Sequence, residues 1–167
     1  MSRRAWLARG LLPLASLLLT AGCGTPARQK LTTRPELRIW SGRLGLSVAS
    51  EPPQSFSAAF ELKGNALDGE LTLSSPLGGT IARLRWSREQ ATLHTAQDVQ
   101  DYDSIETLTR QVVGTSLPLR ALFDWLDGIN TNAAGWRAEL SRLEQGRLVA
   151  TRTDPAPTAE LRLILDQ

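Results

Sequence analysis

Few side chains in this 167-residue sequence suggest chemistry of their own, because it contains one cysteine, Cys23, and one histidine, His94. With a single cysteine, no disulfide can form within the chain. His94 lies at a half-exposed position of an alternating stretch, and no nucleophile-elbow motif or metal-ligand spacing accompanies it. We therefore interpret His94 as a surface or structural residue rather than a catalytic one.

A small acidic cluster is formed by Asp98, Asp101 and Asp103. Such a cluster could bind calcium weakly. Asp103 also precedes Glu106 by three residues, which is a capping-box arrangement at the start of a helix. We therefore expect these aspartates to serve a turn and a helix cap, and we expect neither a metal nor a cofactor.

The surroundings of Cys23 predict that its thiol carries lipid. Basic residues open the chain, residues 10–19 are apolar, and Ala21-Gly22 provides a small-residue cleavage point. The stretch LLLTAGCGT resembles a bacterial lipobox, in which the cysteine is acylated and becomes the new N-terminus. We expect residues 1–22 to be a signal peptide that is removed. The alternative is an unmodified cysteine in a signal peptide that is cut elsewhere.

Removal of this leader changes the charge of the chain. The full sequence has a net charge of +2, but loss of the three leader arginines leaves 16 Lys and Arg against 17 Asp and Glu. No dense basic patch with interleaved aromatic residues remains, which argues against nucleic-acid binding. Residues 23–37 are polar and contain proline, so we interpret them as the lipidated N-terminus and a tether to a single domain, residues 38–167.

Alternating apolar and polar residues predict short strands before and after a central helical region. Turn-length breaks separate the first five, which favours an antiparallel meander over βαβ units. In the third of these, Leu67, Leu71 and Leu73 are expected to share one face. The expected strands lie within residues 38–50, 55–62, 66–75, 80–87, 91–96, 135–143, 146–153 and 159–167.

Two amphipathic helices are predicted between these groups of strands. Apolar residues recur at helical spacing from Ile105 to Val112, and Gly114 ends the first helix. The second begins near Pro118 and ends before Gly128. Each helix must lay its apolar stripe on another element. The sequence therefore predicts a mainly β, α+β fold in which a strongly curved antiparallel sheet has its concave face covered by two helices.

Four motifs follow one another along the mature chain. They are Trp40 with Gly42-Arg43-Leu44, the run Ser75-Pro76-Leu77-Gly78-Gly79, Leu117-Pro118-Leu119 followed by Trp125-Leu126-Asp127-Gly128, and Gly135-Trp136. In this order and spacing they resemble the LolB family of outer-membrane lipoprotein receptors, and the similarity covers nearly the whole mature chain.

This resemblance implies an open, unclosed β-barrel of about 8–11 strands with a helical lid over an apolar cavity. It further implies a monomeric, lipid-anchored protein of the outer membrane that faces the periplasm. Such a protein accepts acylated lipoproteins from the periplasmic carrier LolA and releases them into the inner leaflet of that membrane. The expected partners are therefore the carrier, acylated lipoproteins and membrane lipid, and no enzymatic activity is expected.

The resemblance also assigns a protruding loop with an exposed apolar residue, which here is Leu77, flanked by Pro76 and Gly78. The residues themselves agree, because proline cannot donate to a strand ladder and glycine permits a tight turn. An alternative is that Leu77 folds back as a plug under its own turn.

Candidate residues for the acyl-chain cavity are the inward-facing apolar residues of the strands, together with the apolar stripe of the second helix. For each of them, a place in a solid core is the alternative. The candidates are Leu44, Leu46, Phe56, Phe60, Leu71, Leu73, Leu84, Trp86, Leu122, Phe123 and Leu126.

Two other functions stay open at the level of sequence. A structural lipoprotein of an envelope assembly would use the same anchor but would have a solid core and a flat interaction face. A lipid-modifying hydrolase would need a reactive group inside the cavity, and Ser57 or His94 would have to lie there.

Overall fold

The computed structural model describes residues 38–133 and 135–167. The predicted signal peptide, the lipidation site Cys23 and the tether lie outside the described residues. The elements in chain order are β1 (Ile39–Val48), β2 (Gln54–Gly64), β3 (Gly69–Ser74), β4 (Thr80–Trp86), β5 (Ala91–Thr95), β6 (Val99–Tyr102), α1 (Ile105–Val113), α2 (Leu119–Leu126), β7 (Trp136–Glu139), η1 (Leu143–Gln145), β8 (Arg147–Arg152) and β9 (Ala159–Leu165).

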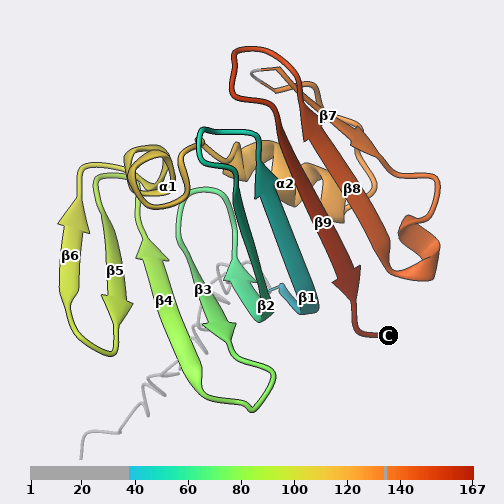
Figure 1. The fold of residues 1–167 in the computed structure, drawn as a ribbon. Helices are drawn as coiled ribbons and strands as arrows, with labels where there is room; N and C mark the ends of the chain where they lie inside the picture. The colour runs from blue at the N-terminus through green and yellow to red at the C-terminus, as the bar shows by residue number, and fades with distance from the viewer. Residues whose placement is uncertain (1–37, 134) are drawn as a thin grey trace, which may run out of the picture. The chain divides into compact units, whose positions relative to one another are not determined.

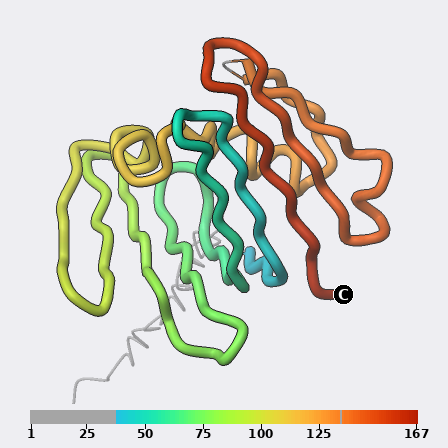
Figure 2. The backbone as a smooth tube through the Cα atoms, in the orientation of Figure 1, coloured from blue at the N-terminus to red at the C-terminus, as the bar shows by residue number. Residues whose placement is uncertain are grey.

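The nine strands of the described residues belong to one antiparallel sheet in the order β6-β5-β4-β3-β2-β1-β9-β8-β7. The first six strands form a meander, and β9 returns to pair with the free side of β1. The two edge strands, β6 and β7, are not bonded to each other in the described part of the chain. They lie at opposite sides of the molecule in Figure 2. The predicted open, curved sheet is therefore confirmed.

The position of the core follows from the alternation of buried and exposed residues along each strand. In β2, Ala58, Phe60 and Leu62 are buried, whereas Ala59 and Glu61 between them are exposed. The same parity continues through the neighbouring strands, so that one face of the sheet is apolar. Both helices cover this face, and α2 crosses the strands behind β1 and β9 in Figure 1.

Backbone geometry at one glycine lets the central strands approach closely. Gly42 in β1 has φ +151°, and a Cβ at this position would lie 1.9 Å from the carbonyl oxygen of Ile164 in β9. A side chain would therefore collide with backbone at the β1–β9 junction, which only glycine avoids.

Aromatic contacts fix α2 against the sheet. The ring of Phe123 packs edge-on against Trp40 of β1 at 5.4 Å and lies 6.4 Å from the ring of Trp86 in β4. On the same helix, the fully buried Trp125 donates its indole N–H to the carbonyl of Thr131 at 2.7 Å. The helix is thus held by apolar burial with its one buried indole donor satisfied.

Four details of the sequence prediction were wrong, and three of them concern the strands and their turns. The sheet has a strand, β6, that was not expected, because its residues are mostly exposed and show little apolar alternation. Leu67 does not share a face with Leu71 and Leu73, since it lies half-exposed in the turn between β2 and β3. The strand that begins at Trp136 ends at Glu139, and Leu143 opens the short helix η1 instead.

The N-cap of α1 is Ser104 rather than the predicted Asp103. Ser104 has an extended backbone, and its hydroxyl accepts a hydrogen bond from the amide of Thr107 at 3.1 Å. Replacing Ser104 with alanine should lower the free energy of unfolding by about 0.5–2 kcal/mol. Asp103→Ala should change it by less than about 0.5 kcal/mol, and urea unfolding of both variants checks the assignment. Equal losses in the two variants would contradict it.

Within the described residues, no helix is long and apolar enough to cross a membrane.

Candidate functional site

A cavity of about 340 Å³ lies between the inner face of the sheet and the two helices. This volume is in the range of pockets that bind small ligands. Nine of the eleven predicted residues line it, and all nine belong to β1–β4 or α2. They are Leu44, Leu46, Phe56, Phe60, Leu71, Leu73, Leu84, Trp86 and Leu122. Their place in the wall agrees with the predicted parity, and their role in binding acyl chains stays a prediction.

The other two predicted residues, Phe123 and Leu126, lie outside the cavity lining. Both are buried in the hydrophobic core, and Phe123 makes the ring contacts with Trp40 and Trp86 described above. Their burial on the same helix as Leu122 indicates that α2 both closes the cavity and anchors itself to the sheet.

Helix α1 contributes a part of the wall that the sequence analysis did not include. Ile105, Leu108, Val112 and Val113 all line the cavity, and Leu117 continues the wall in the link to α2. The signal was present in the sequence, because this apolar stripe already required the helix to cover something. Inward-facing leucines of β5 and β9 also line the cavity, and they follow the same alternation as the predicted residues.

Four side chains in the lining are polar, and two of them are already bonded within the protein. Thr109 donates its hydroxyl to the carbonyl of Glu106 and accepts the amide of Leu117, both at 3.2 Å. The Thr95 hydroxyl donates to the carbonyl of Asp98 at 3.2 Å. Gln54 and Ser55, at the start of β2, are exposed and make no side-chain hydrogen bond to the described residues. The wall is therefore apolar except at its exposed border.

The turn between β3 and β4 places Leu77 in solvent. Leu77 is 98% exposed, and the hairpin projects beyond the ends of β1 and β2 in Figure 1. The amide of Gly78 donates to the carbonyl of Ser75 at 2.9 Å, and the amide of Ser75 donates to the carbonyl of Gly79 at 2.8 Å. Gly78 has φ +85°, as expected for the glycine of a three-residue hairpin loop. The alternative of a leucine plug under the turn is wrong.

The candidate residues of a hydrolase lie away from the cavity. Ser57 is exposed on the outer face of β2, and His94 lies in β5 opposite Arg83, whose side chain is on that outer face. Neither residue lines the cavity. The hydrolase alternative therefore loses the two reactive groups that it required inside the cavity.

Two members of the acidic cluster, Asp98 and Asp101, accept local hydrogen bonds. Asp98 accepts hydrogen bonds from the Gln100 side chain and from the Val99 amide, and these bonds lower the pKa of its carboxyl in that order of effect. Asp101 accepts the hydroxyl of Thr92 at 2.7 Å. Among the described residues, no three acidic, histidine or cysteine side chains are grouped to hold a metal ion.

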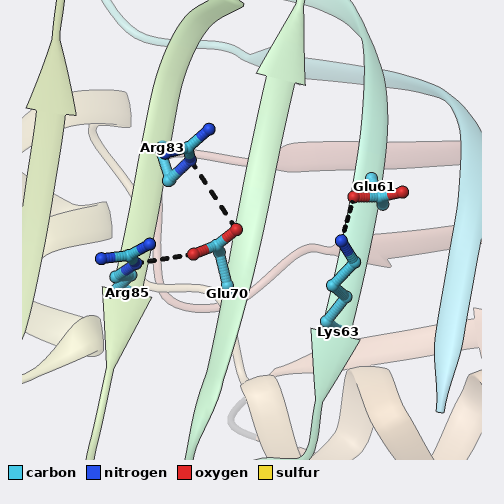
Figure 3. A network of polar contacts seen from close by, with 5 residues as sticks. All are labelled: Glu61, Lys63, Glu70, Arg83 and Arg85. Carbon is cyan, nitrogen blue, oxygen red and sulfur yellow. Dashed lines mark hydrogen bonds and ion pairs between the residues drawn. The ribbon is translucent and has the colours of Figure 1, made fainter. Parts of the chain in front are cut away.

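The outer face of the sheet carries ion pairs between neighbouring strands (Figure 3). Glu70 of β3 lies opposite Arg85 of β4, whose Nε is 2.6 Å from its carboxylate, and the Nε of Arg83 lies 3.7 Å away. The hydrogen bond from Arg85 lowers the pKa of Glu70 below 4.5, although partial burial opposes the shift.

Glu70→Gln therefore has a pH-dependent expected effect. A lowered pKa in the folded state gives stability above pH 4.5, and this stability is lost as the pH falls through the folded-state pKa. At pH 7 the variant should lose up to about 1 kcal/mol, because the pair is partly exposed. Urea unfolding at pH 7 and at about pH 2 measures the difference. A difference that persisted unchanged in acid would show that it does not come from ionisation of Glu70.

Comparison with known proteins shows the family of this chain. The family model described as Outer membrane lipoprotein LolB matches residues 39–158, which include β1 to β8 and both helices. The chain is similar to the outer-membrane lipoprotein LolB of Bordetella petrii, at 28% identity over 98% of this chain and 94% of the relative. It is also similar to that of Vibrio cholerae, at 32% identity over 92% and 77% of the two chains. A third relative, from Chromobacterium violaceum, is 31% identical over 72% of this chain and 68% of its own. The chain therefore belongs to the LolB family of outer-membrane lipoproteins.

Proposed function

We propose that this protein accepts lipoproteins from the periplasmic carrier LolA by binding their acyl chains and then inserts them into the inner leaflet of the outer membrane. The observation that supports this proposal most is the cavity of about 340 Å³, whose wall is almost entirely apolar. A structural lipoprotein of an envelope assembly, the alternative function, would have a solid core. The cavity counts against that alternative.

The energetics of acyl chains explain why such a cavity is needed. Each methylene that leaves water gains about 0.8 kcal/mol, so a cargo with several chains cannot remain exposed during transfer. An apolar cavity removes these chains from water without requiring chemistry. Transfer then runs down a gradient of affinity, in which the carrier holds the cargo least tightly and the bilayer most tightly. No nucleotide is required at this step.

Two features at the membrane side complete the proposal. Acylated Cys23 anchors the protein in the outer membrane, and residues 23–37 let the domain face the periplasm as a monomer. Leu77 contacts the membrane during release, since its side chain is exposed at the end of a projecting hairpin.

Uptake of an acyl probe tests the proposed function. The protein with Cys23 replaced by alanine, which carries no acyl group, is titrated with an environment-sensitive fluorescent acyl probe. A lipoprotein is then added as competitor. We expect the probe to bind saturably at one site and to be displaced by the acylated lipoprotein. The same lipoprotein without its acyl chains should not displace the probe. Failure to take up the probe would support the structural alternative.

A further inference from the structure

The border of the cavity contains one polar side chain that has the inward parity of its strand and makes no side-chain hydrogen bond to the described residues. By the alternation of β2, Gln54 shares the inward parity of Phe56 and Phe60, whereas Ser55 has the outward parity. The other inward polar groups of the wall, on Thr95 and Thr109, are bonded to backbone. The indole N–H of Trp86 likewise donates to the carbonyl of Asn65 at 3.0 Å. Among the inward polar groups of the described lining, Gln54 is therefore the one whose side-chain N–H donors make no hydrogen bond to the described residues.

Gln54 lies where the sheet and the lid meet. It is adjacent to the end of α1, because a Cβ on Gly114, the C-cap of that helix, would be 3.6 Å from its Nε2 and 3.9 Å from its Oε1. Val112 of α1 lines the cavity close to this end of the helix and is 46% exposed. The amide of Gln54 is therefore placed at a solvent-accessible border of the cavity, with apolar wall on its inner side.

The polar groups at this border suit a neutral hydrogen-bond acceptor of a ligand better than an anion. No charged side chain lines the cavity among the described residues, so a carboxylate or phosphate would find no counter-charge there. A side-chain amide offers two N–H donors, which suit neutral carbonyl acceptors. An acyl chain differs from an alkyl chain in carrying such a carbonyl, as an ester or an amide, at its polar end.

Resting on the proposed function, we infer that Gln54 donates a hydrogen bond from Nε2 to an ester or amide carbonyl of the acylated cysteine of the cargo. The chains occupy the apolar cavity, and their carbonyls lie at its border beside Gln54. The amide then replaces water that the carbonyl loses on entry, because a buried carbonyl without a partner is costly. Gln54 thereby makes the cavity prefer acyl-linked chains over alkyl chains of equal length.

Two probes with matched chains test this inference. One is a fluorescent peptide whose N-terminal cysteine carries ester-linked and amide-linked chains. The other carries ether-linked chains in place of the esters and a chain bonded through carbon in place of the amide, all of the same length, so it lacks the carbonyls and adds no charge. Each is titrated into the protein with Cys23→Ala alone and with the further substitution Gln54→Met, which keeps the length of the side chain and removes its donors. Gln90→Met, at an exposed glutamine in the turn before β5 that does not line the cavity, is the matched control.

We expect Q54M to weaken binding of the ester probe about two- to tenfold, which is the range for loss of one hydrogen bond. Binding of the ether probe should change less than twofold, and Q90M should change neither. Equal weakening of both probes, or no change in either, would overturn the role of Gln54. Uptake of neither probe by the protein with Gln54 intact would overturn the proposed function itself, so the two failures are distinguishable. Thermal unfolding of Q54M checks that α1 is undisturbed.

Discussion

Replacing Leu77 with glutamate should reduce incorporation of lipoprotein into liposomes at least tenfold, while uptake of cargo from the carrier stays unchanged. Leu77 is 98% exposed and does not line the cavity, so the substitution removes no contact that holds the fold or the ligand. Transfer of a leucine side chain from water into an apolar phase is favourable by about 1.5–3 kcal/mol of free energy. A glutamate loses this stabilisation, and transfer of its carboxylate into the membrane is itself unfavourable. The two steps are measured separately, as transfer from the loaded carrier and as release into liposomes.

Leu67→Glu is the matched control for this experiment. Leu67 is also a leucine in a hairpin turn, between β2 and β3, and it is 50% exposed. The same change of charge there should leave release close to that of the unsubstituted protein. Equal impairment of uptake and release by L77E would refute the assignment of a membrane contact to the β3–β4 loop, and so would an equal effect of L67E on release.

Leu73→Glu is expected to weaken binding of an acyl probe at least tenfold. Leu73 lines the cavity, is only partly buried, and pairs with Phe60 of β2 and Ala82 of β4. A carboxylate at this position faces apolar wall and would be left without a partner once acyl chains exclude water. Because burial raises the pKa of a carboxyl, binding should recover partly when the pH is lowered to about 5.

The adjacent residue supplies the control for the cavity wall. Thr72 lies on the opposite face of β3, paired with Arg83, so Thr72→Glu adds the same charge to the same strand outside the cavity. Its probe affinity should match that of the unsubstituted protein at both pH values. If L73E bound the probe normally while remaining folded by circular dichroism, the cavity would not be the acyl-chain site.

Periodicity in the sequence was sufficient to predict most of the fold, since burial on one face enforces alternation in a strand and a 3.6-residue stripe in a helix. Strand β6 escaped prediction because it is an edge strand, and Val99, Gln100 and Asp101 are exposed without alternation. The cap of α1 was misplaced by one residue for a related reason. Both Asp103 and Ser104 suit an N-cap, and only backbone geometry decides which hydroxyl or carboxylate reaches an amide.

The cavity wall could be predicted only in part, because inward parity does not distinguish a residue beside empty space from one packed in a core. Leu122 and Phe123 are neighbours in α2, yet Leu122 borders the cavity and Phe123 packs against aromatic rings. That difference depends on how far the helix stands from the sheet, which no local pattern encodes. Gln54 was likewise overlooked, since a polar residue at a strand end is ordinarily part of a turn.

The separation of the two edge strands has a mechanical consequence. In a closed β-barrel, widening the interior would require breaking the main-chain hydrogen bonds between at least one pair of strands. In this protein β6 and β7 are not joined, so the wall can splay between them without loss of any bond of the described sheet. Resistance to expansion then comes from the packing of side chains under the helices rather than from the main chain.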